Sequence, residues 1–172
     1  MNDENLSRDI AAVATLTGTF LLRSGQTSST YFDKYRFESD PELLKRVAEK
    51  MIPLLPAQSE VLAGLELGGV PIATAISLAN GMPTAFVRKK AKDYGTCQAV
   101  EGSEVANKQV VLIEDVITTG GAVVEAVKLV EAAGGNVVGI VCAIWRGDGA
   151  PGIASLPTLS VAAAMTKGDL LA

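Results

Sequence analysis

Two adjacent acids, Glu114 and Asp115, follow an apolar stretch and precede two threonines and two glycines at residues 118–121. The glycines let backbone N–H groups approach an anion closely, and a helix that begins there directs its positive end at the same point. The threonine hydroxyls add further donors. This combination is typical of a phosphate site. Carboxylates beside it indicate a ligand that also carries hydroxyl groups or Mg²⁺, as a ribose 5-phosphate does.

A basic cluster lies in the segment 86–102. Four cations fall within five residues, namely Arg88, Lys89, Lys90 and Lys92. The ordinary interpretation is a solvated loop. The segment is nevertheless long for a connection, and long loops in compact domains are often lids. We favour a lid, because mobile cations can neutralise a departing anion while the closed loop excludes water.

The composition removes several other kinds of site. The chain has no histidine, which excludes a Ser-His-Asp triad, a Cys-His pair and an HExxH zinc helix. Cys97 and Cys142 are too few for a disulfide framework or a zinc site. The net charge of −4 argues against broad attraction to nucleic acid. Apolar runs are too short for a membrane span, and the acidic start is unlike a signal peptide, so we expect a cytoplasmic protein.

The elements that must position these residues follow from periodicity. The pattern predicts a helix over 3–16, β-prone stretches over 19–25 and 27–37, and a helix from Asp40-Pro41 to about Leu55. From residue 60 onward strands alternate with helices, which predicts a parallel α/β sheet with helices on both faces. The expected strands are 61–64, a stretch starting at 84, 110–115, 136–145 and a weaker stretch over 156–165, and the expected helices are 70–81 and 121–135. We expect one domain over 1–172, in which residues 1–40 contribute a cap.

The stretch VLIEDVITTGGA, residues 111–122, resembles the hallmark of the type I phosphoribosyltransferases, which bind phosphoribosyl pyrophosphate (PRPP). The resemblance implies that family's fold, a central parallel sheet with a small N-terminal hood. It also implies Mg²⁺-dependent transfer of phosphoribose, with the metal held mainly by substrate rather than by protein ligands. The residues implied for PRPP are Glu114, Asp115, Val116, Ile117, Thr118, Thr119, Gly120, Gly121 and Ala122, with Asp115 also catalytic.

The basic segment resembles the catalytic loop of the orotate phosphoribosyltransferases. Arg88, Lys89 and Lys92 match its cations, and Lys92 falls on its catalytic lysine. Tyr94 stands where that pattern usually has histidine, so it can donate a hydrogen bond but carries no positive charge. These residues are implied PRPP contacts. The resemblance further implies a homodimer in which the 88–102 loop is shared across the interface.

Three further places match the same family. Arg23 matches a residue that contacts PRPP, and Tyr31 and Phe32 match an aromatic pair that lies against orotate. The segment 64–73 resembles the pyrophosphate loop, although some members carry a lysine about where Gly68 stands. Arg146 follows the last clear strand and matches an arginine that holds the orotate carboxylate, but Trp145 replaces the aspartate that usually precedes it. Thr118 is also an implied orotate contact.

The expected reaction is therefore transfer of phosphoribose from PRPP to orotate, giving orotidine 5′-monophosphate and pyrophosphate. A purine or uracil phosphoribosyltransferase would share residues 111–122 but has no need of this lid. A PRPP-sensing regulator that binds nucleic acid would be expected to add a basic face, which the acidic composition disfavours.

Overall fold

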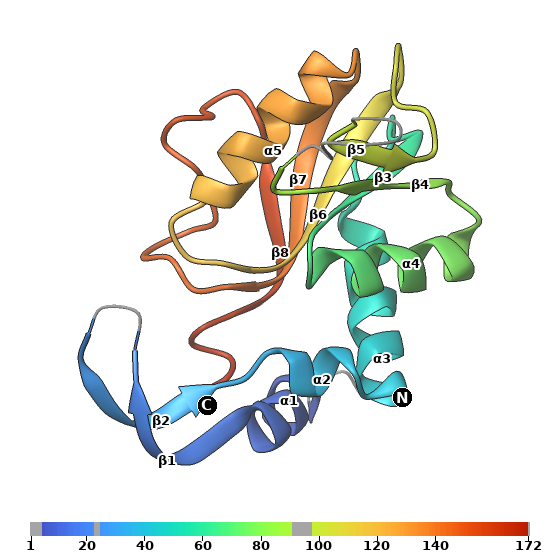
Figure 1. Ribbon diagram of the computed structural model, residues 1–172. Coiled ribbons are helices and arrows are strands. Elements are labelled where there is room, and N and C mark those ends of the chain that lie inside the picture. The colour runs from blue at the N-terminus through green and yellow to red at the C-terminus, as the bar shows by residue number, and fades with distance from the viewer. Residues whose placement is uncertain (1–4, 23–24, 91–97, 172) are drawn as a thin grey trace.

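The computed structural model describes residues 5–22, 25–90 and 98–171. Its main part is a six-stranded sheet, and a separate two-stranded hairpin lies with two short helices beneath one end of it (Figure 1). The order of strands in the main sheet is β5-β4-β3-β6-β7-β8. These strands span Val61–Leu65 (β3), Thr84–Val87 (β4), Val100–Gly102 (β5), Gln109–Ile117 (β6), Asn136–Trp145 (β7) and Val161–Thr166 (β8).

Every neighbouring pair in the main sheet is parallel except β4 and β5. The chain leaves β3 toward β4 on one side, and it leaves β6 toward β7 on the other side. The sheet therefore has its topological switch point between β3 and β6, where Gly64 pairs with Ile113. Ligands of open α/β sheets bind beyond the carboxyl ends of the strands at this point. The acids predicted to act in binding directly follow Ile113.

Helices cover both faces of the sheet, as the sequence predicted. One face packs against α3 (Pro41–Met51) and α4 (Gly69–Asn80), and the other packs against α5 (Gly121–Ala132). The central strands are apolar on both faces for this reason. Asp40 caps α3 by accepting from the N–H groups of Glu42 and Leu43, and Gly81 ends α4 in the left-handed region.

The N-terminal hood consists of α1 (Leu6–Ala14), the antiparallel strands β1 (Thr15–Leu21) and β2 (Thr27–Phe32), and α2 (Tyr35–Glu38). Leu6, Ile10 and Phe37 anchor it in the core that also contains α3 and α4. The hairpin and α2 lie below the carboxyl end of the sheet, close to the C-terminus (Figure 1). The hood thus faces the edge at which ligands are expected.

Several boundaries differ from the sequence-based expectations. The helix expected over 3–16 ends at Ala14, and the stretch expected over 19–25 is a strand over Thr15–Leu21. The stretch expected over 156–165 is a strand over Val161–Thr166. The β-prone stretch 27–37 ends as a strand at Phe32, because Phe37 turns into the core on the short helix α2. The strand expected over 110–115 runs on to Ile117, since Val116 and Ile117 pair with Ile144 and Trp145 of β7. The last residues of the expected 88–102 loop form β5, which pairs with β4.

The lengths and compositions of the helices bear on whether the chain could span a membrane. Among the described residues, no helix combines the length and the apolar character that a bilayer crossing requires.

Candidate active site

The loop after β6 presents an open anion-binding surface. Gly120 adopts a φ of +79° as the residue before α5, and a side chain there would collide with Ile153. Thr118, Thr119, Gly121 and Ala122 are exposed around it. The first turn of α5 therefore offers free backbone N–H groups and hydroxyl donors to a ligand, as the sequence predicted.

Neighbouring residues cover the two acids near the end of β6. Asp115 has no exposed surface. Its Oδ2 lies 2.5 Å from Nζ of Lys34, and its Oδ1 accepts from the N–H of Val116 at 2.5 Å. Glu114 is partly buried, and its Oε2 has no hydrogen-bond partner. The carboxylates thus face one ammonium group and little water.

A third carboxyl group, that of Glu38, joins this cluster from α2. Glu38 is 6% exposed and its Oε1 also has no hydrogen-bond partner. Gly68, the residue before α4, packs directly against this cluster. A Cβ at Gly68 would overlap the carboxylate of Asp115 and would lie 2.8 Å from Oε1 of Glu38. The segment after β3 can pass over the acids only because residue 68 has no side chain.

Burial controls the charges of the cluster. Burial, followed by the neighbouring Asp115, raises the pKa of Glu38 to about 8 and that of Glu114 to about 9. Burial lowers the pKa of Lys34, but its contact with Asp115 outweighs this effect and raises the pKa overall. Near neutral pH the cluster therefore consists of one ion pair, Lys34 with Asp115, and two protonated glutamic acids.

A hollow of about 360 Å³ lies between the hood and the ends of β7 and β8. Arg146 lines it, with its guanidinium carbon 5.4 Å from the centre of the Phe32 ring. The backbone N–H of Arg146 donates to the carbonyl of Ile117 at 2.8 Å, which ties this residue to the end of β6. Tyr31 also lines the hollow, but its ring packs at 5.5 Å against that of Phe20. Arg146 and the aromatic pair are thus brought together.

A second hollow of about 290 Å³ joins the start of the basic segment to the start of α5. Arg88 and Lys89 line it together with Gly121 and Ala122. The backbone N–H of Lys89 donates to the carboxylate of Glu66, in the segment after β3. The structure therefore places these two predicted cations beside the predicted phosphate loop.

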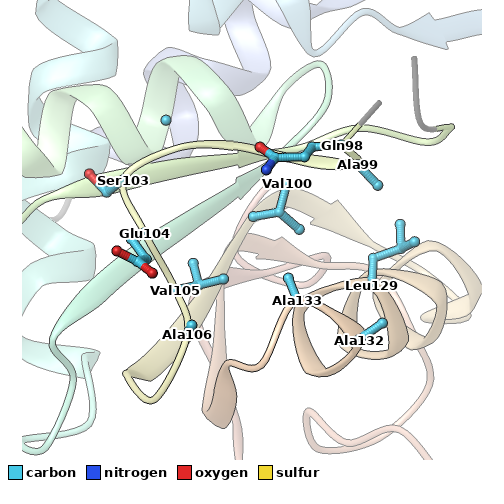
Figure 2. A pocket seen from close by; sticks show the side chains of 11 residues that line it. Gln98, Ala99, Val100, Ser103, Glu104, Val105, Ala106, Leu129, Ala132 and Ala133 are labelled. Atoms are coloured by element: carbon cyan, nitrogen blue, oxygen red, sulfur yellow. The ribbon is translucent and has the colours of Figure 1, made fainter. Parts of the chain in front are cut away.

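A third hollow, larger than these two at about 580 Å³, lies away from the acids of β6. Figure 2 shows it between the segment 98–106 and the C-terminal end of α5, where Val100 and Val105 face Leu129 and Ala133. Among the residues that the structure describes, no cation lines it, and its side chains are apolar apart from Gln98, Ser103 and Glu104. Size alone therefore does not identify the site.

Some predicted residues lie outside the described part of the chain, namely Arg23, Lys92 and Tyr94. Trp145 is described, and its indole N–H donates to the carbonyl of Gly149 at 3.1 Å while the ring is buried. It therefore holds the turn that follows Arg146.

The sequence alone did not predict a role for Lys34 or Glu38. Lys34 directly precedes α2 and Glu38 is its last residue, so their spacing of four residues turns both side chains toward Asp115. The interpretation of this stretch as a strand therefore missed the helical spacing.

The fold and the site together define a phosphoribosyltransferase. Residues 38–155 match the phosphoribosyl transferase domain, and the chain belongs to this family. Several similar proteins within the family are orotate phosphoribosyltransferases. The enzyme of that name from a Nocardioides species is 54% identical over 98% of this chain and 94% of its own length.

Solved structures agree. Orotate phosphoribosyltransferase from Mycobacterium tuberculosis, in complex with Fe(III) dicitrate, superposes with a TM-score of 0.85 at 31% identity, covering 97% of each chain. The same enzyme in complex with PRPP superposes with a TM-score of 0.81 at 28% identity, covering 98% of each chain.

Proposed function

We propose that this protein transfers phosphoribose from PRPP to orotate, giving orotidine 5′-monophosphate and pyrophosphate in pyrimidine biosynthesis. One observation carries the proposal. The exposed anion-binding turn before α5, the acids of β6 and the hollow holding Arg146 all meet at the carboxyl edge of one sheet. We further propose a single domain acting in the cytoplasm, without a nucleic-acid partner.

The phosphate loop holds the 5-phosphate in this proposal. Residues 116–122 supply backbone N–H groups and the hydroxyls of Thr118 and Thr119. Glu114 and Asp115 receive the ribose hydroxyls and stabilise the positive charge that develops on the ribose carbon as pyrophosphate leaves. Because Asp115 is buried and Lys34 contacts its Oδ2, we propose that the Lys34 ammonium gives way when ribose binds there.

The departing pyrophosphate is neutralised by cations of the basic segment. Arg88 and Lys89 line a hollow with the start of α5, and Lys92, Tyr94 and Arg23 complete the set that the resemblance implies. Mg²⁺, when bound, offsets the charge of the pyrophosphate oxygens. We propose that the substrate, rather than a set of protein ligands, holds most of this metal.

Orotate binds in the hollow between the hood and β7 in this proposal. Its carboxylate pairs with the guanidinium of Arg146, while Phe32 and Tyr31 flank the ring and Thr118 closes the edge nearest the phosphate loop. The charge of orotate at neutral pH lies on its carboxylate, so the ring nitrogen loses its proton as the bond to ribose forms. The departing pyrophosphate can take up that proton, so the nitrogen needs positioning rather than a strong base from the protein. The absence of histidine is therefore compatible with the reaction.

We propose that the protein acts as a homodimer, with the 88–102 segment shared across the interface. The exposed face of α4 supports this, because the helix carries no charged residue and Leu78 is 85% exposed. We expect Leu78→Asp to shift the protein toward monomer in sedimentation velocity at micromolar concentration, and to lower activity on dilution. Leu21→Asp, at another exposed leucine, is the matched control. An unchanged dimer in Leu78→Asp would move the interface elsewhere.

The decisive assay follows the ultraviolet absorbance of orotate with protein, PRPP and Mg²⁺ present. We expect the absorbance to fall only when all components are present, and to recover when product and pyrophosphate are supplied instead. A PRPP-dependent reaction with uracil or a purine base, but none with orotate, would overturn the assignment of the base while leaving the PRPP site intact.

A further inference from the structure

Glu38 is the most deeply buried carboxyl group that the reaction described above does not use. It is 6% exposed, it comes from the hood rather than from the sheet, and its Oε1 has no hydrogen-bond partner. An unpartnered carboxyl group in such a place is costly unless it serves a neighbour. Its neighbour is Asp115, the acid that the proposed reaction requires.

The two groups that approach Asp115 from the hood are not equivalent. Lys34 is 32% exposed at its side chain, and its contact with Oδ2 must be exchanged when ribose binds. Glu38 lies deeper, and its Oε1 points to the same place below Gly68 as Oδ2 of Asp115 does. After Lys34 has withdrawn, Glu38 is the group that remains beside Asp115.

We propose that Glu38 is a positioning residue for phosphoribosyl transfer: its protonated carboxyl group donates a hydrogen bond to Asp115 and holds that carboxylate toward the ribose hydroxyls. This inference rests on the proposed function. A neutral donor suits the task, because an ionised Glu38 would repel Asp115 and offer it no proton.

Whether Glu38 can donate to Asp115 depends on its protonation, which the groups around it control. The charged and titratable groups that face it are Lys34, Asp33, Asp115 and Glu114. Asp9 of α1 and Arg46 of α3 pair with each other at 2.8 Å, and α4 carries no titratable residue. Burial and Asp115 raise the pKa of Glu38 to about 8. Asp115 therefore loses its donor as the pH rises through that value.

The test compares Glu38→Gln with Glu38→Ala. Glutamine keeps a neutral donor at every pH, whereas alanine removes it. We expect Glu38→Ala to raise the KM for PRPP by roughly tenfold to a hundredfold, as a misplaced substrate contact does, with little change in the KM for orotate. Glu38→Gln should stay within about threefold of the parent at pH 7. It should also lose the fall in kcat/KM for PRPP that the parent shows as the pH rises through about 8.

Glu42→Gln, an exposed glutamate on α3, is the matched control and should keep the parent's pH profile. Thermal melting checks that each variant is folded. The inference would be overturned if the parent turns over orotate and Glu38→Gln still shows the parent's fall in kcat/KM for PRPP above about pH 8. Unchanged KM values in folded Glu38→Ala would also overturn it. An inactive parent would instead contradict the proposed function, so the two failures are distinguishable.

Discussion

Gly68→Ala should lower kcat/KM for PRPP by more than about a hundredfold. A methyl group at residue 68 would overlap the carboxylate of Asp115 and press on Glu38. Either the segment after β3 rises from the site or Asp115 rotates away from Lys34. Disturbing a buried ion pair in this way costs about 3–5 kcal/mol when one partner is lost, so we also expect a lower melting temperature.

Steady-state kinetics with PRPP as the varied substrate, together with thermal melting, would measure both effects. Gly152→Ala is the control, because a side chain at residue 152 meets nothing within 4 Å and its φ is not positive. Parent-like kinetics in Gly68→Ala would show that the segment 66–69 is not confined by the acids, contrary to the geometry described above.

Arg146→Ala should weaken orotate selectively. A paired guanidinium and carboxylate contribute about 1.5–3 kcal/mol, so the KM for orotate should rise roughly tenfold to a hundredfold while that for PRPP stays within about twofold. The backbone N–H of Arg146, which donates to Ile117, is kept in the variant, so the end of β7 should be preserved.

Arg146→Lys separates charge from geometry. Lysine keeps the positive charge but cannot make two parallel hydrogen bonds to a carboxylate or stack its plane over Phe32, so it should recover only part of the affinity. Arg8→Ala, at an exposed arginine of α1, is the control. Equal loss of affinity for PRPP and orotate in Arg146→Ala would place the carboxylate contact elsewhere.

The sequence was sufficient to predict the sheet and the glycine turn at its strand-to-helix junction, to which phosphate binding is assigned as a proposal. Both depend on local patterns: apolar runs such as 110–115, and glycines such as Gly120 at a strand-to-helix junction. The pairing of Phe32 with Arg146 was also anticipated, although only through the resemblance to a family, since these residues stand more than a hundred positions apart.

The contacts made by Lys34 and Glu38 could not be predicted in the same way. The stretch 33–38 has too few residues for a helical period to be visible, and its aromatic residues favour a strand. Its functional meaning depends on Asp115, which lies far away along the chain and is reached only through the packing of the hood. A pattern that spans a few residues contains no information on such a contact.

The three carboxyl groups below Gly68 also have a thermodynamic consequence. Glu38 and Glu114 have pKa values of about 8 and about 9 in the folded protein, against an ordinary value of 4.5. Folding near neutral pH therefore takes up close to two protons at this place. This contribution to stability is greatest below about pH 4.5, falls progressively above that pH, and levels off once the pH passes about 9. The cost of burying these carboxyl groups is therefore greatest in alkaline solution, at the same point where the protein is proposed to receive ribose.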